Sequence, residues 1–76
     1  MMYITFKDIK KPIAIKGMIQ FTSVGVYFDT HSVKIRKTLE EKYKTHEFRG
    51  RIYIGNKMFR ENVNHIYEND KTDWDD

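Results

Sequence analysis

Residues 29–43, DTHSVKIRKTLEEKY, decide the fold class because the spacing of the apolar residues changes within them. Before this stretch, apolar side chains recur at every second residue, as they do in half-buried strands. Inside it, Ile35, Leu39 and Tyr43 follow at steps of four, which is the spacing of one helix face. The apolar series is preceded by three residues whose side chains can cap the first helical turn, Asp29, Thr30 and Ser32. The sequence therefore predicts a helix between strands.

Three strands are predicted before this helix, over residues 2–7, 13–21 and 24–28. The segment Lys10-Lys11-Pro12 separates the first two, because proline lacks the N–H that a strand ladder requires. Gly17 interrupts the longest alternating stretch and indicates a bulge or a close backbone approach.

After the helix, the two-residue spacing returns over residues 48–54, with Phe48 facing inward and Arg49, Arg51 and Tyr53 outward. A second helix is predicted to start at Asn56, and its apolar stripe consists of Phe59, Val63, Ile66 and Tyr67. A hairpin turn at residues 55–56 with a return strand over 57–59 is the alternative. We therefore expect an α+β fold of order βββαβα, a mainly antiparallel sheet with two helices packed on one face.

The chain has 76 residues, which is enough for one small domain, predicted over residues 1–68. Residues 1–60 carry 13 Lys or Arg against 5 Asp or Glu, whereas residues 61–76 carry one Lys against six acids. Residues 69–76 contain one large apolar side chain, so we expect a disordered acidic tail there. The basic body favours a polyanionic partner.

Several classes of function are disfavoured. The chain has no cysteine, which excludes disulfides and thiolate metal sites. His31, His46 and His65 have no short ligand spacing, and no nucleophile accompanies them, so we expect no catalytic residue, metal or cofactor. No apolar run is long enough to span a bilayer, and the N-terminus lacks the features of a secretory signal, so we expect a cytoplasmic protein with no membrane partner.

Basic and aromatic residues indicate a nucleic-acid-binding module, with single-stranded nucleic acid or RNA favoured. Guanidinium groups match phosphate oxygens, and tyrosine rings stack on bases. Lysines in the first loop would add phosphate contacts. The candidate interface consists of Arg49, Arg51, Tyr53, Lys57, Arg60, Lys10 and Lys11.

Residues 49–54, RGRIYI, resemble the central-strand signature of the RNA-recognition motif, which starts with a basic residue and glycine and continues with alternate aromatics. Arg51 occupies the position of the first stacking aromatic, and three predicted strands before the helix differ from the βαββαβ order of that family. The resemblance is limited to one strand and assigns no family.

A protein-binding inhibitor or adaptor is the alternative function, such as a small phage-encoded antagonist of a host nucleic-acid enzyme or defence system. The partner would then be a nucleic-acid-processing protein, bound by pairing at a sheet edge or by the tail. The tail residues concerned are Asp73, Trp74, Asp75 and Asp76. The sequence also leaves open whether the chain forms a homodimer.

Overall fold

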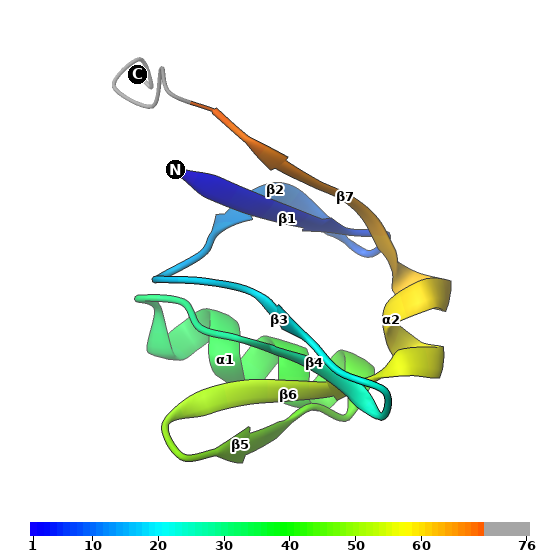
Figure 1. Cartoon of the computed structure of the whole chain (residues 1–76). Coiled ribbons are helices and arrows are strands. Elements are labelled where there is room, and N and C mark those ends of the chain that lie inside the picture. Colours follow the sequence, from blue (N-terminus) through cyan, green and yellow to red (C-terminus); the bar gives the residue numbers. More distant parts are fainter. Residues whose placement is uncertain (70–76) are drawn as a thin grey trace.

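The chain folds into two antiparallel sheets that share one core with a helix (Figure 1). The structure, a computed structural model, describes residues 1–69. Their elements are β1 (Met2–Phe6), β2 (Ile9–Ala14), β3 (Gln20–Phe21), β4 (Gly25–Phe28), α1 (Val33–Tyr43), β5 (His46–Phe48), β6 (Arg51–Gly55), α2 (Asn56–Asn62) and β7 (Val63–Glu68). The α+β class and the antiparallel pairing are as predicted, whereas the order βββαβα is wrong. The acidic tail predicted for residues 69–76 lies outside the described residues apart from Asn69.

The strands form a three-stranded sheet of order β2-β1-β7 and a four-stranded sheet of order β3-β4-β6-β5. In Figure 1 the three-stranded sheet lies above the four-stranded one, and α2 joins them at one side. The single sheet expected from the sequence is therefore divided in two. The division falls inside the predicted strand 13–21, because β2 ends at Ala14 and the chain bends at Gly17, where φ is 80°. After the bend, β3 pairs with β4 in the other sheet.

The second helix is shorter than its apolar stripe predicts. It ends at Asn62, and Val63 to Glu68 form β7, which pairs with β1 in antiparallel fashion. Ile66 lies opposite Ile4 in this pairing and packs against the core. Pairing with a strand some sixty residues earlier in the chain therefore determines the conformation here, although the four-residue spacing of apolar residues predicts a helix. Val63 and Ile66 are β-branched, which favours a strand. Helix over residues 57–60, rather than the alternative return strand, is confirmed.

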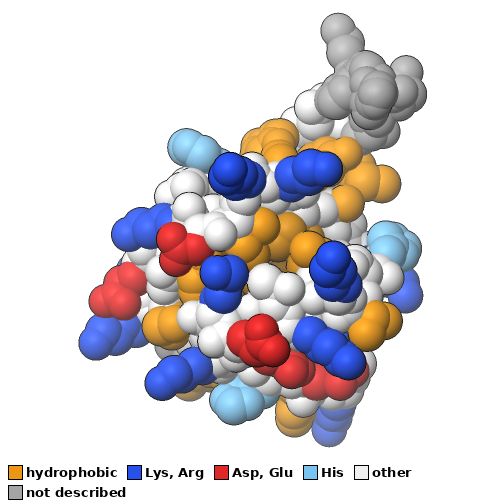
Figure 2. All heavy atoms as spheres, turned by 180° about the vertical axis from the view of Figure 1, so that it is seen from behind, with side chains coloured by type: hydrophobic (Ala, Val, Ile, Leu, Met, Phe, Trp, Pro, Cys, Tyr) orange, Lys and Arg blue, Asp and Glu red, His pale blue; other side chains and the backbone are white. Residues whose placement is uncertain are grey.

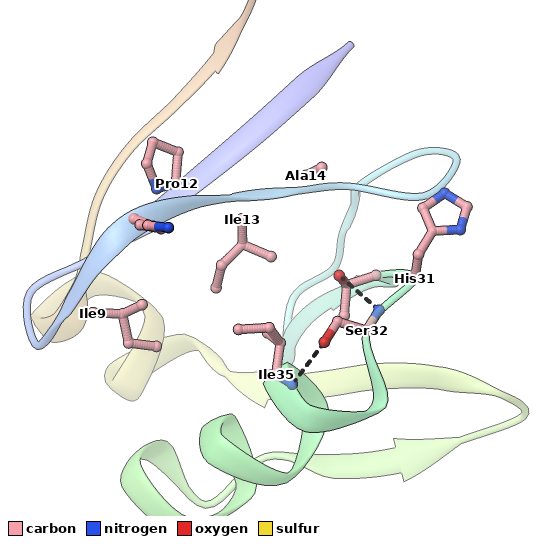
Figure 3. A pocket seen from close by; sticks show the side chains of 9 residues that line it. Ile9, Pro12, Ile13, Ala14, His31, Ser32 and Ile35 are labelled. Atoms are coloured by element: carbon pink, nitrogen blue, oxygen red, sulfur yellow. Dashed lines mark hydrogen bonds between the residues drawn. The ribbon is translucent and has the colours of Figure 1, made fainter. Parts of the chain in front are cut away.

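The first helix, α1, is confirmed with its cap. The Ser32 hydroxyl accepts a hydrogen bond from the Ile35 N–H at 3.1 Å (Figure 3). The helix ends at Tyr43 and is followed by Lys44, whose φ is 58°. The side of the molecule that carries α1 shows Lys and Arg side chains spread around a central strip of apolar ones (Figure 2).

The core lies between the sheets and α1. Phe6 of β1 stacks on Tyr43 of α1 with ring centroids 4.8 Å apart, and the Tyr43 hydroxyl accepts a hydrogen bond from the Asp8 N–H. Each fully buried large apolar side chain contributes about 1.5–3 kcal/mol to folding. The buried apolar residues are Ile4, Phe6, Ile13, Ile15, Val26, Phe28, Leu39, Tyr43, Ile52 and Ile54. Because α1 and these side chains occupy one face of the four-stranded sheet, its other face is left for contacts with solvent or a partner.

Candidate functional site

The outer face of the four-stranded sheet brings aromatic residues together from separate strands. Tyr27 of β4 lies opposite Tyr53 of β6, and Tyr53 lies opposite His46 of β5. Residues paired across antiparallel strands project to the same face, so these side chains form one row. Phe48 and Arg51 form the next pair on this face. We call the set Tyr27, Phe48, Arg49, Arg51 and Tyr53 the aromatic face.

The rings of the aromatic face contact one another and carry guanidinium groups. The ring centroid of Tyr27 lies 5.0 Å from that of Tyr53 and 5.9 Å from that of Phe48. The guanidinium carbon of Arg51 lies 5.1 Å from the Tyr27 centroid, and that of Arg49 lies 5.4 Å from the Phe48 centroid. Both distances are within the range of cation–π attraction. Positive charge is therefore placed directly beside aromatic surface.

The backbone of β4 holds Tyr53 in a defined orientation. Its hydroxyl donates a hydrogen bond to the Val24 carbonyl at 2.8 Å. Its ring also covers Gly25, where an added Cβ would lie 2.4 Å from the Tyr53 Cε1 atom. Only glycine at position 25 therefore leaves room for the ring to lie over the strand.

The aromatic face is partly open to solvent. Phe48 is 49% exposed and Val24 is 64% exposed, while Tyr27, Tyr53 and Arg51 are half-buried. A shallow hollow of about 250 Å³ lies among these side chains. It is lined by Val24, Tyr27, His46, Glu47, Phe48 and Tyr53. A flat ligand group can therefore reach the rings.

The predicted strand over residues 48–54 is in fact a hairpin, and this changes the place of Arg49. Arg49 and Gly50 form the two-residue turn between β5 and β6, with φ values of 52° and 79°. Positive φ at both central residues is typical of the turn that matches the twist of paired strands. Arg49 therefore extends from the hairpin tip, and Phe48 lies on the outer face rather than inward.

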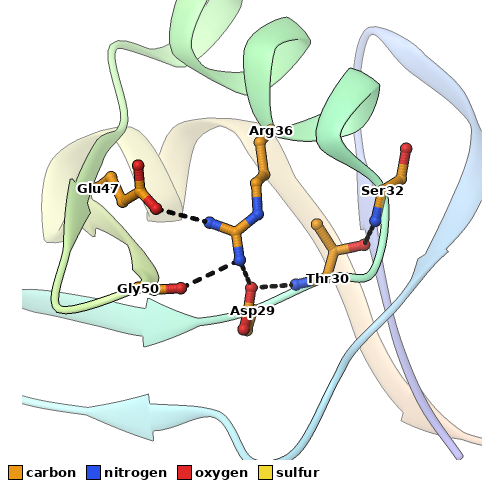
Figure 4. A network of polar contacts seen from close by, with 6 residues as sticks. All are labelled: Asp29, Thr30, Ser32, Arg36, Glu47 and Gly50. Carbon is orange, nitrogen blue, oxygen red and sulfur yellow. Dashed lines mark hydrogen bonds and ion pairs between the residues drawn. The ribbon is translucent and has the colours of Figure 1, made fainter.

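Arg36 of α1 fastens this hairpin from the opposite side (Figure 4). Its guanidinium donates to the Asp29 carboxylate and to the Gly50 carbonyl, the latter at 3.0 Å. It also forms an ion pair with Glu47 of β5 at 3.6 Å. The turn that carries Arg49 is thereby tied to the end of β4.

The predicted interface residues fall into three places. Arg49, Arg51 and Tyr53 come together on the aromatic face. Lys57 and Arg60 are exposed on α2, which starts beyond the end of β6 that lies farthest from Arg51. Lys10 and Lys11 are exposed on β2, an edge strand of the other sheet, so the prediction that Lys10-Lys11-Pro12 form a loop between strands is wrong. The tail residues Asp73, Trp74, Asp75 and Asp76 lie outside the described residues.

Tyr27 and Phe48 are members of the aromatic face that the sequence reasoning missed. Tyr27 lies between the inward residues Val26 and Phe28, so the two-residue spacing already indicated that its ring projects outward. Phe48 could be placed only after the hairpin turn at residues 49–50 was recognised.

Residues 1–69 contain no cluster of His, Asp or Glu side chains of the size that a metal ion needs. None of the helices in this part of the chain is long and apolar enough to cross a membrane. No protein-family model, curated protein or solved structure matches this chain.

Proposed function

We propose that this protein binds single-stranded nucleic acid on the outer face of its four-stranded sheet. The observation that carries the proposal is the aromatic face, where three rings and two guanidinium groups from β4, β6 and the β5–β6 hairpin lie within contact of one another. Stacking of a base on an aromatic side chain contributes about 1–3 kcal/mol, and it tolerates any base because each has a π face.

The two arginines supply the complementary charge. A guanidinium beside a ring can contact the phosphate of a nucleotide whose base stacks on that ring. Residues 1–69 carry 13 Lys or Arg and 7 Asp or Glu, so the described body attracts a polyanion.

The open rings of this face favour single strands over duplexes. Bases in a duplex are stacked on each other, and their faces are not available to protein rings. The aromatic face lies on the strands of a sheet and has no helix of its own to enter a major groove.

The test measures binding of a fluorescein-labelled 12-nucleotide single strand, as RNA and as DNA, by fluorescence anisotropy over a range of salt concentrations. If Arg49 and Arg51 each neutralise one phosphate, they contribute about −1.4 to the slope of log K against log[salt], and Arg51→Gln reduces its magnitude by about 0.7. Lys42→Gln, which removes the same charge from the exposed end of α1, should leave the slope nearly unchanged.

Ring variants test the stacking separately from the charge. Phe48→Leu and Tyr27→Leu keep an apolar side chain without a flat surface, and each should weaken binding about 5- to 100-fold. Tyr53→Phe keeps the ring and should bind nearly as the unaltered protein does. Equal affinity for the duplex of the same sequence, or ring variants that bind normally, would refute the proposal.

A further inference from the structure

A second hollow lies on the opposite side of the molecule, between the edge strand β2 and the start of α1. Its volume is about 280 Å³. Ile13 projects from β2 toward Ile35 of α1 across it, and Ile9 lies at one end (Figure 3). This hollow shares no lining residue with the one on the aromatic face.

Two polar side chains in its wall, those of Thr30 and Ser32, are engaged within the protein, and the other two, those of Lys11 and His31, belong to exposed residues. The Ser32 hydroxyl accepts from the Ile35 N–H at 3.1 Å, and the Thr30 hydroxyl accepts from the Ser32 N–H at 3.5 Å. Ile9 and Ile35 are half-buried, and Pro12 is exposed. The hollow therefore offers mainly apolar surface to a ligand.

The charge around the hollow is mainly positive, with Asp8 as an exposed acid next to the lining residue Ile9. Lys11 lines it, Lys10 is its exposed neighbour on β2, and Lys34 is exposed in the first turn of α1. The lining contains no carboxylate, and the first turn of α1 contains no acid. Figure 2 shows Lys and Arg side chains around the apolar strip on this side of the molecule, with Asp and Glu side chains among them. An occupant with acidic groups beside an apolar anchor is complementary to both features.

Two other occupants fit less well. A second copy of the chain docked by this face would bring another lysine-bearing edge against the first, and like charges repel. Pairing of an added strand with β2 is hindered by Pro12, which has no N–H to donate, and lysine and proline at an edge oppose such pairing. Insertion of side chains into the hollow requires no new strand ladder.

We propose that this groove binds an acidic segment of a partner protein, with a large apolar side chain of the segment in the hollow and its carboxylates beside Lys10, Lys11 and Lys34. This site is independent of the aromatic face. The proposal for this groove and the proposal for the aromatic face can therefore be confirmed or refuted separately.

The test uses the full-length protein and a fluorescein-labelled peptide, EDEFLDEE, with EDEAADEE, in which both large apolar residues are alanine, as its anchor-free counterpart of equal length and charge. The first peptide should bind saturably at physiological salt, and the second should bind at least about tenfold more weakly, because the buried anchor is lost. Equal binding of both peptides would overturn the proposal, since attraction would then be purely electrostatic.

Matched double variants locate the site. Lys10→Gln with Lys11→Gln should weaken peptide binding about tenfold, as expected for two charge pairs at a rim. Arg49→Asn with Arg51→Gln removes the same charge from the aromatic face and should leave peptide affinity unchanged while nucleic-acid affinity falls. Equal loss of peptide affinity in both variants would contradict the proposed location.

Two further outcomes would assign the groove to another occupant and overturn the proposal. One is a dimer of the protein, detected in sedimentation experiments, that dissociates when the peptide is added. The other is a blue-shifted emission of Trp74, the only tryptophan of the chain, that returns to the solvent-exposed wavelength when the peptide is added.

Discussion

Replacement of Gly25 by alanine tests how tightly the aromatic face is built. An added Cβ would lie 2.4 Å from Tyr53 Cε1 and 2.6 Å from both Tyr53 Cζ and the Ile54 carbonyl oxygen. Ordinary contacts between carbon atoms are about 3.5–4.0 Å. The ring must therefore move by about 1 Å or more, and the carbonyl belongs to the backbone of the paired strand β6, which cannot swing aside.

The expected cost follows from these distances. Overpacking of this kind costs about 1–3 kcal/mol, and displacement of the ring also endangers the 2.8 Å hydrogen bond from Tyr53 to Val24, worth about 0.5–1.5 kcal/mol. We expect Gly25→Ala to lower the free energy of unfolding by about 2–4 kcal/mol. Domains of this size hold only about 3–5 kcal/mol, so the variant should be close to unfolding.

Gly55 provides the matched control, because it lies opposite Gly25 in the β4–β6 pairing. An added Cβ there meets nothing within 4 Å, and its φ of −65° suits alanine. Gly55 is also the N-cap of α2, where alanine is less favourable than glycine, so Gly55→Ala should lower the free energy of unfolding by no more than about 1 kcal/mol. Urea unfolding followed by circular dichroism measures both variants. If Gly25→Ala were as stable as Gly55→Ala, the close packing of Tyr53 on β4 would be refuted.

Three further substitutions test other parts of the fold by the same unfolding assay. Ser32→Ala removes the cap of α1 and should cost about 1 kcal/mol, whereas no loss would mean that the Ile35 N–H finds another acceptor. Arg36→Met leaves the largely buried Asp29 carboxylate without its cation and should lower the free energy of unfolding by about 1–3 kcal/mol. Arg36→Lys should restore only part of this stability, because one ammonium group cannot reach all the acceptors of the guanidinium. The buried Thr45 hydroxyl has no hydrogen-bond partner among the described residues, so Thr45→Val should be neutral or stabilising, and a loss above about 1 kcal/mol would contradict this.

The parts of the fold that depend on neighbouring residues could be predicted from the sequence. The α1 helix combines a capping serine with apolar residues at four-residue steps, and both features act within the segment itself. The first strand, β1, shows the same local clarity, with Ile4 and Phe6 buried as their alternation indicates.

The parts that depend on distant partners could not be predicted. Val63 and Ile66 fit a helical stripe with Phe59, and only pairing with β1 places them in a strand. The alternation over residues 13–21 is continuous in the sequence, yet the bend at Gly17 sends its two ends to different sheets. Local spacing does not specify which strand another strand will pair with.

The residues of the candidate site also divide into those that local spacing predicts and those whose place depends on distant parts of the chain. Simple alternation predicts that Arg51 and Tyr53 project outward, and the structure brings them together with the rings of Tyr27 and Phe48. Charge is the only sequence feature that Lys10 and Lys11 share with them. Charge does not carry positional information, and β2 belongs to the other sheet.

The most direct test of the proposed function is an NMR titration of the full-length, ¹⁵N-labelled protein with the 12-nucleotide single strand. We expect the largest amide shift changes on β4, β6 and the hairpin turn, at Tyr27, Phe48, Arg49, Arg51 and Tyr53. Shift changes confined to β2 and α1, or none at saturating oligonucleotide, would contradict the proposed function.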